Sequence, residues 1–207
     1  MKSLRFPDKP SHIYSLKMIR EGDFIAQPKL DGHNALIFRE KGELVVLSRV
    51  MKPLAISDDM RAALKFLPLE DGTVLNGEWT CRREAWKEEG MFLFDMMYEK
   101  GEWIGHWPIE ERMMKLIQIH AGVRPVTGKW PVHLVAGQTE NYAKLYKSLI
   151  DNMKTEGIVL KRKGSKLVGD FHKSVDNPAM FKLKWRDGCD GMTRMIVPDE
   201  DLKTKED

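Results

Sequence analysis

The chain is poor in cysteine: its 207 residues contain two, Cys81 and Cys189. Two thiols so far apart form neither a disulfide framework nor a recognisable zinc site, and we interpret both as incidental. Long apolar runs are missing as well, since none approaches the roughly 20 residues that a membrane span requires. The N-terminus lacks the apolar core of a secretory signal. These absences predict a cytoplasmic protein with no membrane partner.

The familiar nucleotide-binding signatures are also absent. The segment GVRPVTGKW, residues 122–130, resembles a P-loop, but five residues separate its glycines instead of four. Trp130 also occupies the position of the hydroxyl residue that would bind a metal. No GxGxxG occurs, which excludes the usual signature of a dinucleotide-binding Rossmann unit.

Neither sign of charge dominates, because 34 lysines and arginines face 31 acidic residues and leave a net charge of +3. The distribution is more informative than the sum. The segment 161–186 is rich in cations and contains Asp170 and Asp176 as its acidic residues, which suits a polyanion and equally a solvated basic face. The candidate nucleic-acid contacts are Lys161, Arg162, Lys163, Lys166 and Lys173.

Short apolar or alternating runs dominate the chain and predict strands. Helical periodicity interrupts them at 58–67, 109–120 and 140–153. Because the order of elements is mixed, we predict an α+β fold with mainly antiparallel sheets flanked by helices. We expect one domain over residues 1–190 and a short charged tail over 191–207. The predicted strands are 24–29, 34–39, 43–48, 73–79, 91–97, 132–135, 157–162 and 180–185.

Several charged residues interrupt these apolar strands, where an unpaired charge would be costly. In AQPKLDGHNAL, residues 26–36, Lys29 and Asp31 are two positions apart, a spacing that places both side chains on one face of a strand. Lys182 and Lys184 share this spacing. Alternatively, Asp-Gly forms an ordinary hairpin turn, and the other charges lie at exposed strand ends or on an edge strand.

The order of these motifs resembles that of the covalent nucleotidyltransferases, the superfamily of ATP-dependent DNA ligases, RNA ligases and capping enzymes. The resemblance covers residues 25–186 and implies a nucleotidyltransferase (adenylation) domain with an ATP-grasp-like fold. Six ordered matches make coincidence improbable. They are Lys29-Leu30-Asp31-Gly32, Ser48-Arg49, Asn76-Gly77-Glu78, Phe94-Asp95, Glu156-Gly157-Ile158-Val159 and Lys182-Leu183-Lys184.

The resemblance implies that Lys29 attacks the α-phosphorus of ATP, which requires a neutral amine and yields a lysyl-adenylate. Asp31 would hold Lys29 and help to organise the metal or ribose side. Lys182 and Lys184 would neutralise the α-phosphate, and Glu156 would coordinate a divalent ion, Mg²⁺ or Mn²⁺.

The same resemblance assigns residues to the nucleoside. Glu78 and Arg49 would contact the ribose hydroxyls, while Phe94 and Val159 would cover the two faces of adenine. Gln27, where many DNA ligases have glutamate, would accept a hydrogen bond from the adenine amine.

The sequence is most similar to small viral or bacterial ATP-dependent DNA ligases, which implies a monomer that seals nicked duplex DNA during repair, replication or recombination. A viral protein of this type would act in the host cytoplasm. Asn34 stands where DNA ligases usually carry arginine and is closer to some ligases that join RNA ends. RNA ligase is therefore the alternative.

Too few residues follow Arg186 to form the C-terminal OB-fold that ligases normally carry. The chain could be a minimal ligase or a fragment, or a protein partner could supply the missing OB-fold function. An alternative of another class is that the chain is a catalytically silent nucleotide- or nick-binding module that needs a partner.

Overall fold

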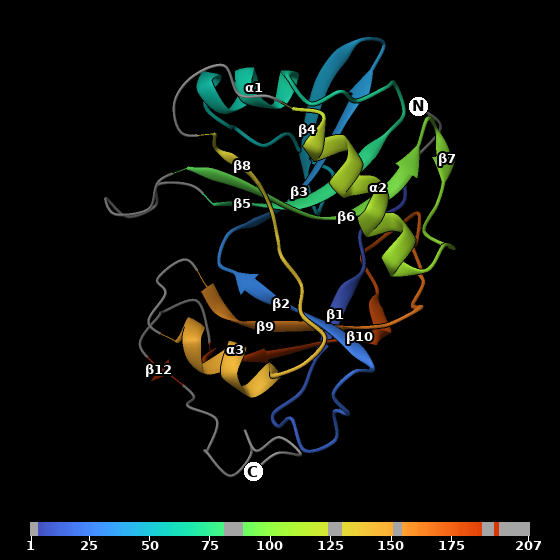
Figure 1. Ribbon diagram of the computed structural model, residues 1–207. Coiled ribbons are helices and arrows are strands. Elements are labelled where there is room, and N and C mark those ends of the chain that lie inside the picture. The colour runs from blue at the N-terminus through green and yellow to red at the C-terminus, as the bar shows by residue number, and fades with distance from the viewer. Residues whose placement is uncertain (1–3, 81–88, 124–129, 151–154, 188–192, 195–207) are drawn as a thin grey trace. The chain divides into compact units, whose positions relative to one another are not determined.

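The computed structural model describes residues 4–80, 89–123, 130–150, 155–187 and 193–194 (Figure 1). The chain folds into two compact units, each assembled from separate segments. Unit 1 comprises Met1–Asp8, Gly32–Val135 and Lys166–Val175, and unit 2 comprises Lys9–Asp31, Ala136–Ser165 and Asp176–Asp207.

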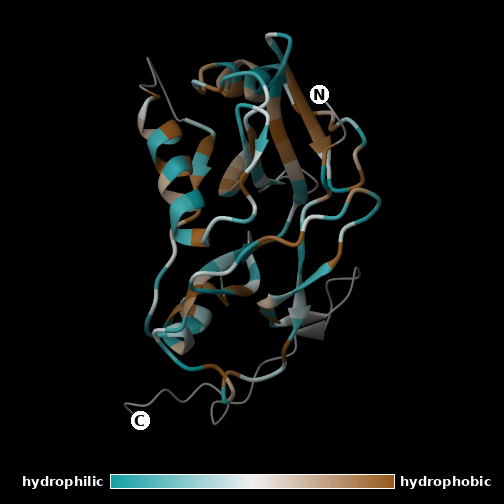
Figure 2. Cartoon of the chain, turned by 90° about the vertical axis from the view of Figure 1, so that its right-hand side faces the viewer, coloured by the Kyte–Doolittle hydropathy of each residue, from teal (hydrophilic) through white to brown (hydrophobic). Residues whose placement is uncertain are grey.

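Within the described ranges, unit 1 is built on a six-stranded sheet in the order β4-β3-β5-β6-β7, with β8 beside β6. Its pairs are antiparallel except for β6 and β8, which run parallel. Figure 2 shows hydrophobic stretches within the strands, next to hydrophilic ones. The strands are β3 (His33–Glu40), β4 (Glu43–Ser48), β5 (Val74–Thr80), β6 (Gly90–Glu99), β7 (Glu102–Trp103) and β8 (Val132–Leu134).

Two helices cover one face of this sheet. Helix α1 (Asp58–Lys65) begins after Ser57, whose Oγ accepts a hydrogen bond from the backbone N–H of Met60 at 3.1 Å and so caps the helix. Helix α2 (Ile109–Ala121) buries Leu116. Both helices contribute to the main core, which includes inward-facing residues of β3, β5 and β6.

Unit 2 contains a four-stranded sheet in the order β1-β10-β9-β2, as far as the described residues show. Its strands are β1 (Lys9–His12), β2 (Phe24–Leu30), β9 (Thr155–Arg162) and β10 (Asp176–Lys184). Helix α3 (Tyr142–Leu149) packs on one face, where Tyr142 and Tyr146 meet Ala26, Ile158, Leu160 and Leu183 in a buried cluster. A short ribbon, β11 (Arg186–Asp187) and β12 (Thr193–Arg194), follows.

The α+β class and the antiparallel sheets agree with the sequence prediction. The interpretation of Asp31-Gly32 as a hairpin turn is wrong, because β2 pairs with β9 whereas β3 belongs to the sheet of unit 1. We expected a domain boundary at residue 190 and no OB-fold after Arg186. That boundary and most of the residues after Arg186 lie outside the described residues. The helices in the described part of the chain are too short or too polar to cross a membrane.

Candidate active site

One face of the unit 2 sheet gathers most of the predicted catalytic residues. Strands β2, β9 and β10 pair in antiparallel register, so that residues opposite each other, and residues two positions apart, point to the same face. Since Ala26, Ile158 and Leu183 face α3, the alternate positions face away from it. In the first row Gln27 lies opposite Val159 and Val159 opposite Lys182; in the second, Lys29 lies opposite Gly157 and Gly157 opposite Lys184.

Glu156 reaches this face through a β-bulge. Lys29 pairs with Gly157 and Leu30 pairs with Thr155, which leaves Glu156 as the extra residue of β9. A bulge interrupts the alternation of side chains and re-aims one of them. The adjoining Gly157 has a φ of +150°, and a Cβ there would collide with the carbonyl oxygen of Leu183. The bulge therefore depends on glycine at this position.

The carboxylate of Glu156 joins two lysines. Its Oε1 accepts a hydrogen bond from Lys29 Nζ, and its Oε2 accepts one from Lys184 Nζ at 2.8 Å. The side chains of Lys29, Glu156 and Lys184 are 19%, 15% and 24% exposed. A shared carboxylate offsets the repulsion between the two partly buried ammonium groups and fixes both in place. The nucleophile predicted from sequence is thus held beside a second cation.

Asp31 is placed differently from the prediction. Strand β2 ends at Leu30, so Asp31 lies in the bend that follows. The expectation that Lys29 and Asp31 share a strand face is therefore wrong, because strand alternation does not extend to Asp31.

The predicted nucleoside contacts Arg49, Glu78 and Phe94 belong to unit 1. Asn34, Glu78 and Phe92 lie opposite one another across β3, β5 and β6, on the face away from α1 and α2. The Asn34 amide donates to Asn76 Oδ1 at 2.9 Å and to the carbonyl oxygen of Gly77 at 3.3 Å. Because a backbone carbonyl only accepts, this contact identifies the amide nitrogen of Asn34 and directs it toward β5.

Phe94 and Arg49 occupy irregular backbone. The pairing shifts between Asn76 and Gly77 leave Phe94 as the extra residue of β6, so a second predicted site residue lies at a β-bulge. Arg49 follows β4 in a turn, and its Nε is buried without a hydrogen-bond partner among the described residues. A buried donor of this kind is normally satisfied, and a bound oxygen-rich ligand would satisfy it.

Asp95, the charge within the apolar strand β6, pairs with a residue that sequence analysis did not single out. Arg112 of α2 donates from Nε to Asp95 Oδ1 at 2.8 Å and from Nη2 to Oδ2 at 3.1 Å. The side chain of Asp95 is 3% exposed and that of Arg112 is 1% exposed. Arg112 falls at the helical spacing of the buried residues of α2, and this spacing could have identified it from the sequence. The pair is structural.

The predicted nucleic-acid contacts are divided between the units. Lys161, Arg162 and Lys163 belong to unit 2, whereas Lys166 and Lys173 belong to unit 1. All but Lys161 are exposed. Lys161 is 2% exposed and shares the sheet face of Lys182, so its ammonium is not available to a surface-bound phosphate chain. The prediction for Lys161 therefore needs correction.

For a divalent ion, the described residues provide no group of three or more histidine, cysteine, aspartate or glutamate ligands. Glu156 offers one carboxylate, whose oxygens contact Lys29 and Lys184. Magnesium commonly binds through one or two carboxylates together with substrate phosphates and water. This donor set fits an ion that arrives with a triphosphate, and does not fit a cage built from protein alone.

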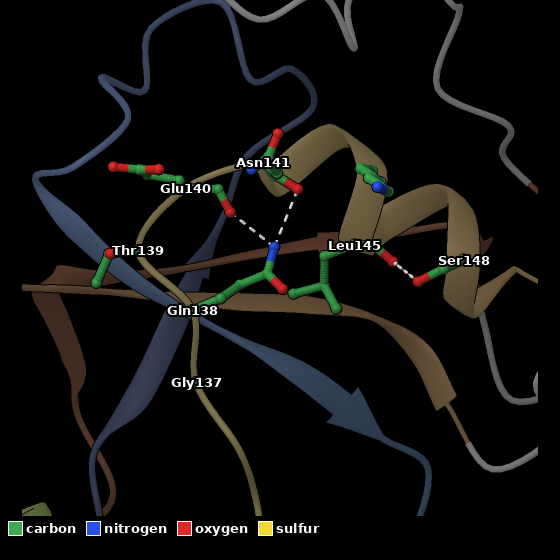
Figure 3. A pocket seen from close by; sticks show the side chains of 8 residues that line it. Gly137, Gln138, Thr139, Glu140, Asn141, Leu145 and Ser148 are labelled. Carbon is green, nitrogen blue, oxygen red and sulfur yellow. Dashed lines mark hydrogen bonds between the residues drawn. The ribbon is translucent and has the colours of Figure 1, made fainter.

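A pocket of about 570 Å³ lies elsewhere in unit 2, at the start of α3 (Figure 3). Gln138 lines the pocket, and its Nε2 donates hydrogen bonds to the carbonyl oxygens of Glu140 at 2.7 Å and Asn141 at 3.0 Å. None of the predicted site residues lines this pocket, which is shallow. Its lining residues are Gly137, Gln138, Thr139, Glu140, Asn141, Lys144, Leu145 and Ser148.

Comparison with known proteins places the fold. No family profile and no curated protein matches the chain. Among solved structures it is similar to the ligase domain of M. tuberculosis LigD, with a TM-score of 0.68 and 16% identity over 87% of this chain and 59% of that one. A Chlorella virus DNA ligase-adenylate gives a TM-score of 0.62 and 15% identity over 88% of this chain and 68% of that one. An archaeal ATP-dependent RNA ligase gives a TM-score of 0.56 and 17% identity over 85% of this chain and 47% of that one.

These likenesses establish an α+β fold similar to the nucleotidyltransferase domains of ATP-dependent ligases. At such low identity they establish the fold alone. The chain spans 59% of the length of the LigD ligase domain.

Proposed function

We propose that this protein is an ATP-dependent polynucleotide ligase whose first step transfers AMP to Lys29. The observation that carries the proposal is the contact of Lys29 Nζ with Glu156, whose other oxygen binds Lys184. A lysine fixed on a partly buried sheet face beside a second cation suits attack on a polyphosphate. The fold similarity to ligase domains supports the same reaction class.

The proposed reaction has three steps. The neutral amine of Lys29 forms a P–N bond to the α-phosphorus of ATP, while the bond to pyrophosphate breaks and the amine loses a proton. A 5′-phosphate oxygen of the polynucleotide then attacks that phosphorus, and the P–N bond breaks as the Lys29 nitrogen takes up a proton and leaves as the amine. Finally a 3′-hydroxyl loses its proton and attacks the activated 5′-phosphate, which forms the phosphodiester and releases AMP.

We propose roles for the residues of unit 2 that share this sheet face. Glu156 positions Lys29, and Lys182 and Lys184 neutralise charge on the α-phosphate. Mg²⁺ arriving with ATP would withdraw charge from the phosphates, with Glu156 and Asp31 as its protein ligands. Gln27 and Val159 occupy the same face and would contact adenine.

Arg49, Glu78 and Phe94 of unit 1 are proposed as nucleoside contacts because of their motifs. The buried, unsatisfied Nε of Arg49 supports a role in binding an oxygen of the ligand. Glu78 would accept from the ribose hydroxyls, and Phe94 would stack on adenine.

Nicked duplex DNA is the proposed substrate, in keeping with the DNA ligases among the similar structures. RNA ends are the second candidate, favoured by Asn34. The amide nitrogen of Asn34 is directed to β5, and the residue lacks the charged guanidinium of the arginine that DNA ligases usually carry. A partner protein that supplies OB-fold function is also proposed.

The test is incubation with Mg²⁺ and α-labelled ATP, followed by denaturing electrophoresis. Wild-type protein should carry a covalent label, and Lys29→Ala should not. Lys144→Ala is a matched control, because Lys144 is exposed on α3, which packs on the opposite sheet face. Chasing the labelled protein with nicked DNA or with RNA ends then separates the two substrates.

Retention of the label in Lys29→Ala would overturn the assignment of the nucleophile. Absence of label from folded wild-type protein, checked by mass for prior adenylation, would overturn autonomous adenylation. ATP or nick binding without transfer would then favour the catalytically silent module.

A further inference from the structure

The segment that joins β1 to β2 separates its side chains into two rows with a spacing of three residues. Ile13, Leu16 and Ile19 pack against the core of unit 2, with Leu16 6% exposed. The alternate row, Tyr14, Lys17 and Arg20, is exposed. Backbone hydrogen bonds from Ile13 N to Lys182 O at 3.0 Å and from Ile19 N to Leu16 O at 2.8 Å hold the segment in place.

The exposed row carries an aromatic platform. Tyr14 is 71% exposed, and its ring stacks on that of His12, with centroids 6.4 Å apart and planes 20° from parallel. Met18, which is 95% exposed, adds an adaptable apolar side chain close by in the sequence. Solvent-exposed apolar groups held by a fixed backbone point to a ligand with a flat apolar face.

The platform lies next to the candidate active site within the same sheet. Strand β1 is the neighbour of β10, and His12 is the register partner of Lys182. His12 is exposed and shares a face with Lys182, because partners across paired strands point to the same side.

The charge of the segment matches a phosphate chain. Residues 9–20 contain Lys9, Lys17 and Arg20 and no acidic residue. Two acids flank this range: Asp8 accepts hydrogen bonds from the backbone N–H groups of Val168 at 2.7 Å and Gly169 at 2.9 Å, and Glu21 accepts one from the backbone N–H of Tyr142 at 3.0 Å. Lys9 Nζ lies 3.8 Å from Asp176 Oδ1, which offsets part of its charge. Cations beside an exposed aromatic pair are the combination that binds single-stranded nucleic acid, where bases stack and phosphates meet lysine or arginine.

We infer that His12 and Tyr14 form a stacking site for an unpaired base of the polynucleotide, with Lys17 and Arg20 on the adjoining phosphates. This inference rests on the proposed function for its choice of ligand. A continuous duplex buries its base faces, so the site favours a strand with an unpaired nucleotide near the reacting end. It assigns a substrate contact to a segment outside the nucleotidyltransferase motifs.

The test is fluorescence anisotropy with a labelled single-stranded oligonucleotide and a blunt duplex of the same length. Tyr14→Ala should weaken single-strand binding about 5-fold or more and duplex binding by less than about 2-fold. Tyr14→Phe keeps the ring and should bind like wild type. Phe66→Ala, which removes another exposed ring (62% exposed) in unit 1, is the matched control and should also bind like wild type.

The salt dependence of binding tests the two charged residues, Lys17 and Arg20. Combined Lys17→Gln and Arg20→Gln should reduce the slope of log K against log salt by about 1.4, the value for two single-strand phosphates. Single-strand binding by Tyr14→Ala within 2-fold of wild type, or an equal loss for duplex, would overturn the inference. Labelling of Lys29 by ATP is scored separately, so that oligonucleotide binding without labelling would reject autonomous adenylation and leave the stacking site in place.

Discussion

Asp95 and Arg112 form a bidentate ion pair in the interior of unit 1, between strand β6 and helix α2. Removing one partner leaves an uncompensated buried charge. Arg112→Met should therefore lower the free energy of unfolding by about 3–5 kcal/mol, measured by urea denaturation. The double variant Asp95→Leu with Arg112→Met should recover part of this loss, because no buried charge remains.

A nearby surface pair provides the control for that experiment. Lys115 of α2 contacts Glu99 Oε1 at 2.8 Å, and its side chain is 39% exposed. Lys115→Met should change stability by less than about 1 kcal/mol, because water screens the pair. Equal losses for the two single variants would contradict the structural role of the buried pair.

Gly157→Ala should disrupt the bulge that aims Glu156. The added Cβ meets the backbone of β10, 2.8 Å from Lys184 Cα, at a φ that disfavours other residues. We expect a loss of about 2–6 kcal/mol from strain and overpacking, together with loss of Lys29 labelling. Gly164→Ala is the control: it also has a positive φ, but its Cβ has no neighbour within 4 Å, and it should cost about 1–2 kcal/mol and keep labelling.

Glu156→Gln tests the link between Lys29, the proposed nucleophile, and its neighbours. The substitution keeps the shape of the side chain but removes the charge that holds Lys29 and Lys184. The rate of lysyl-AMP formation, measured by quenched labelling, should fall about 100-fold. Glu140→Gln, an exposed carboxylate at the pocket beside α3, should leave the rate unchanged. A Glu156→Gln rate within 3-fold of wild type would contradict the role of Glu156.

Tyr142→Phe should weaken the attachment of α3 to β2. The hydroxyl donates to the carbonyl oxygen of Phe24 at 2.8 Å and accepts from the backbone N–H groups of Gly22 and Phe24 at 3.2 Å. Its loss should cost about 1–3 kcal/mol in urea denaturation. Tyr14→Phe, at an exposed tyrosine, should cost nothing measurable.

The same hydroxyl predicts a pH dependence. Burial raises the pKa of Tyr142 above its ordinary value near 10. The unfolded chain therefore ionises first, and the contribution of Tyr142 to stability is complete below pH 10 and declines as pH rises toward the folded-state pKa. Wild-type protein should lose stability more steeply above pH 10 than Tyr142→Phe. Parallel curves would contradict the raised pKa.

Local patterns predicted much of the fold. The apolar spacing over 58–67 and 109–120 corresponds to α1 and α2, and alternation placed Lys182 and Lys184 on one face of β10. Strand β1 was missed, because Lys-Pro-Ser-His has none of the apolar or β-branched character of a strand. It forms because β10 offers a parallel neighbour far along the chain.

The features that complete the candidate site depended on distant partners. Sequence did not reveal that Glu156 sits at a bulge, because a bulge is defined by the opposite strand. It did not predict the burial of Lys161, which follows from its position on the sheet face. The partner of Asp95 required the packing of α2 on β6.

Because each unit is assembled from separate segments of the chain, paired strands are completed at different times during synthesis. Strands β1 and β2 leave the ribosome early, but their partners β10 and β9 come from the last third of the chain. At about 5–20 residues per second, β2 waits roughly 6–30 s for β9, while β3 to β6 can already pair with one another. Lys29, the proposed nucleophile, therefore acquires Glu156 and Lys184 as neighbours only after residue 184 has been made.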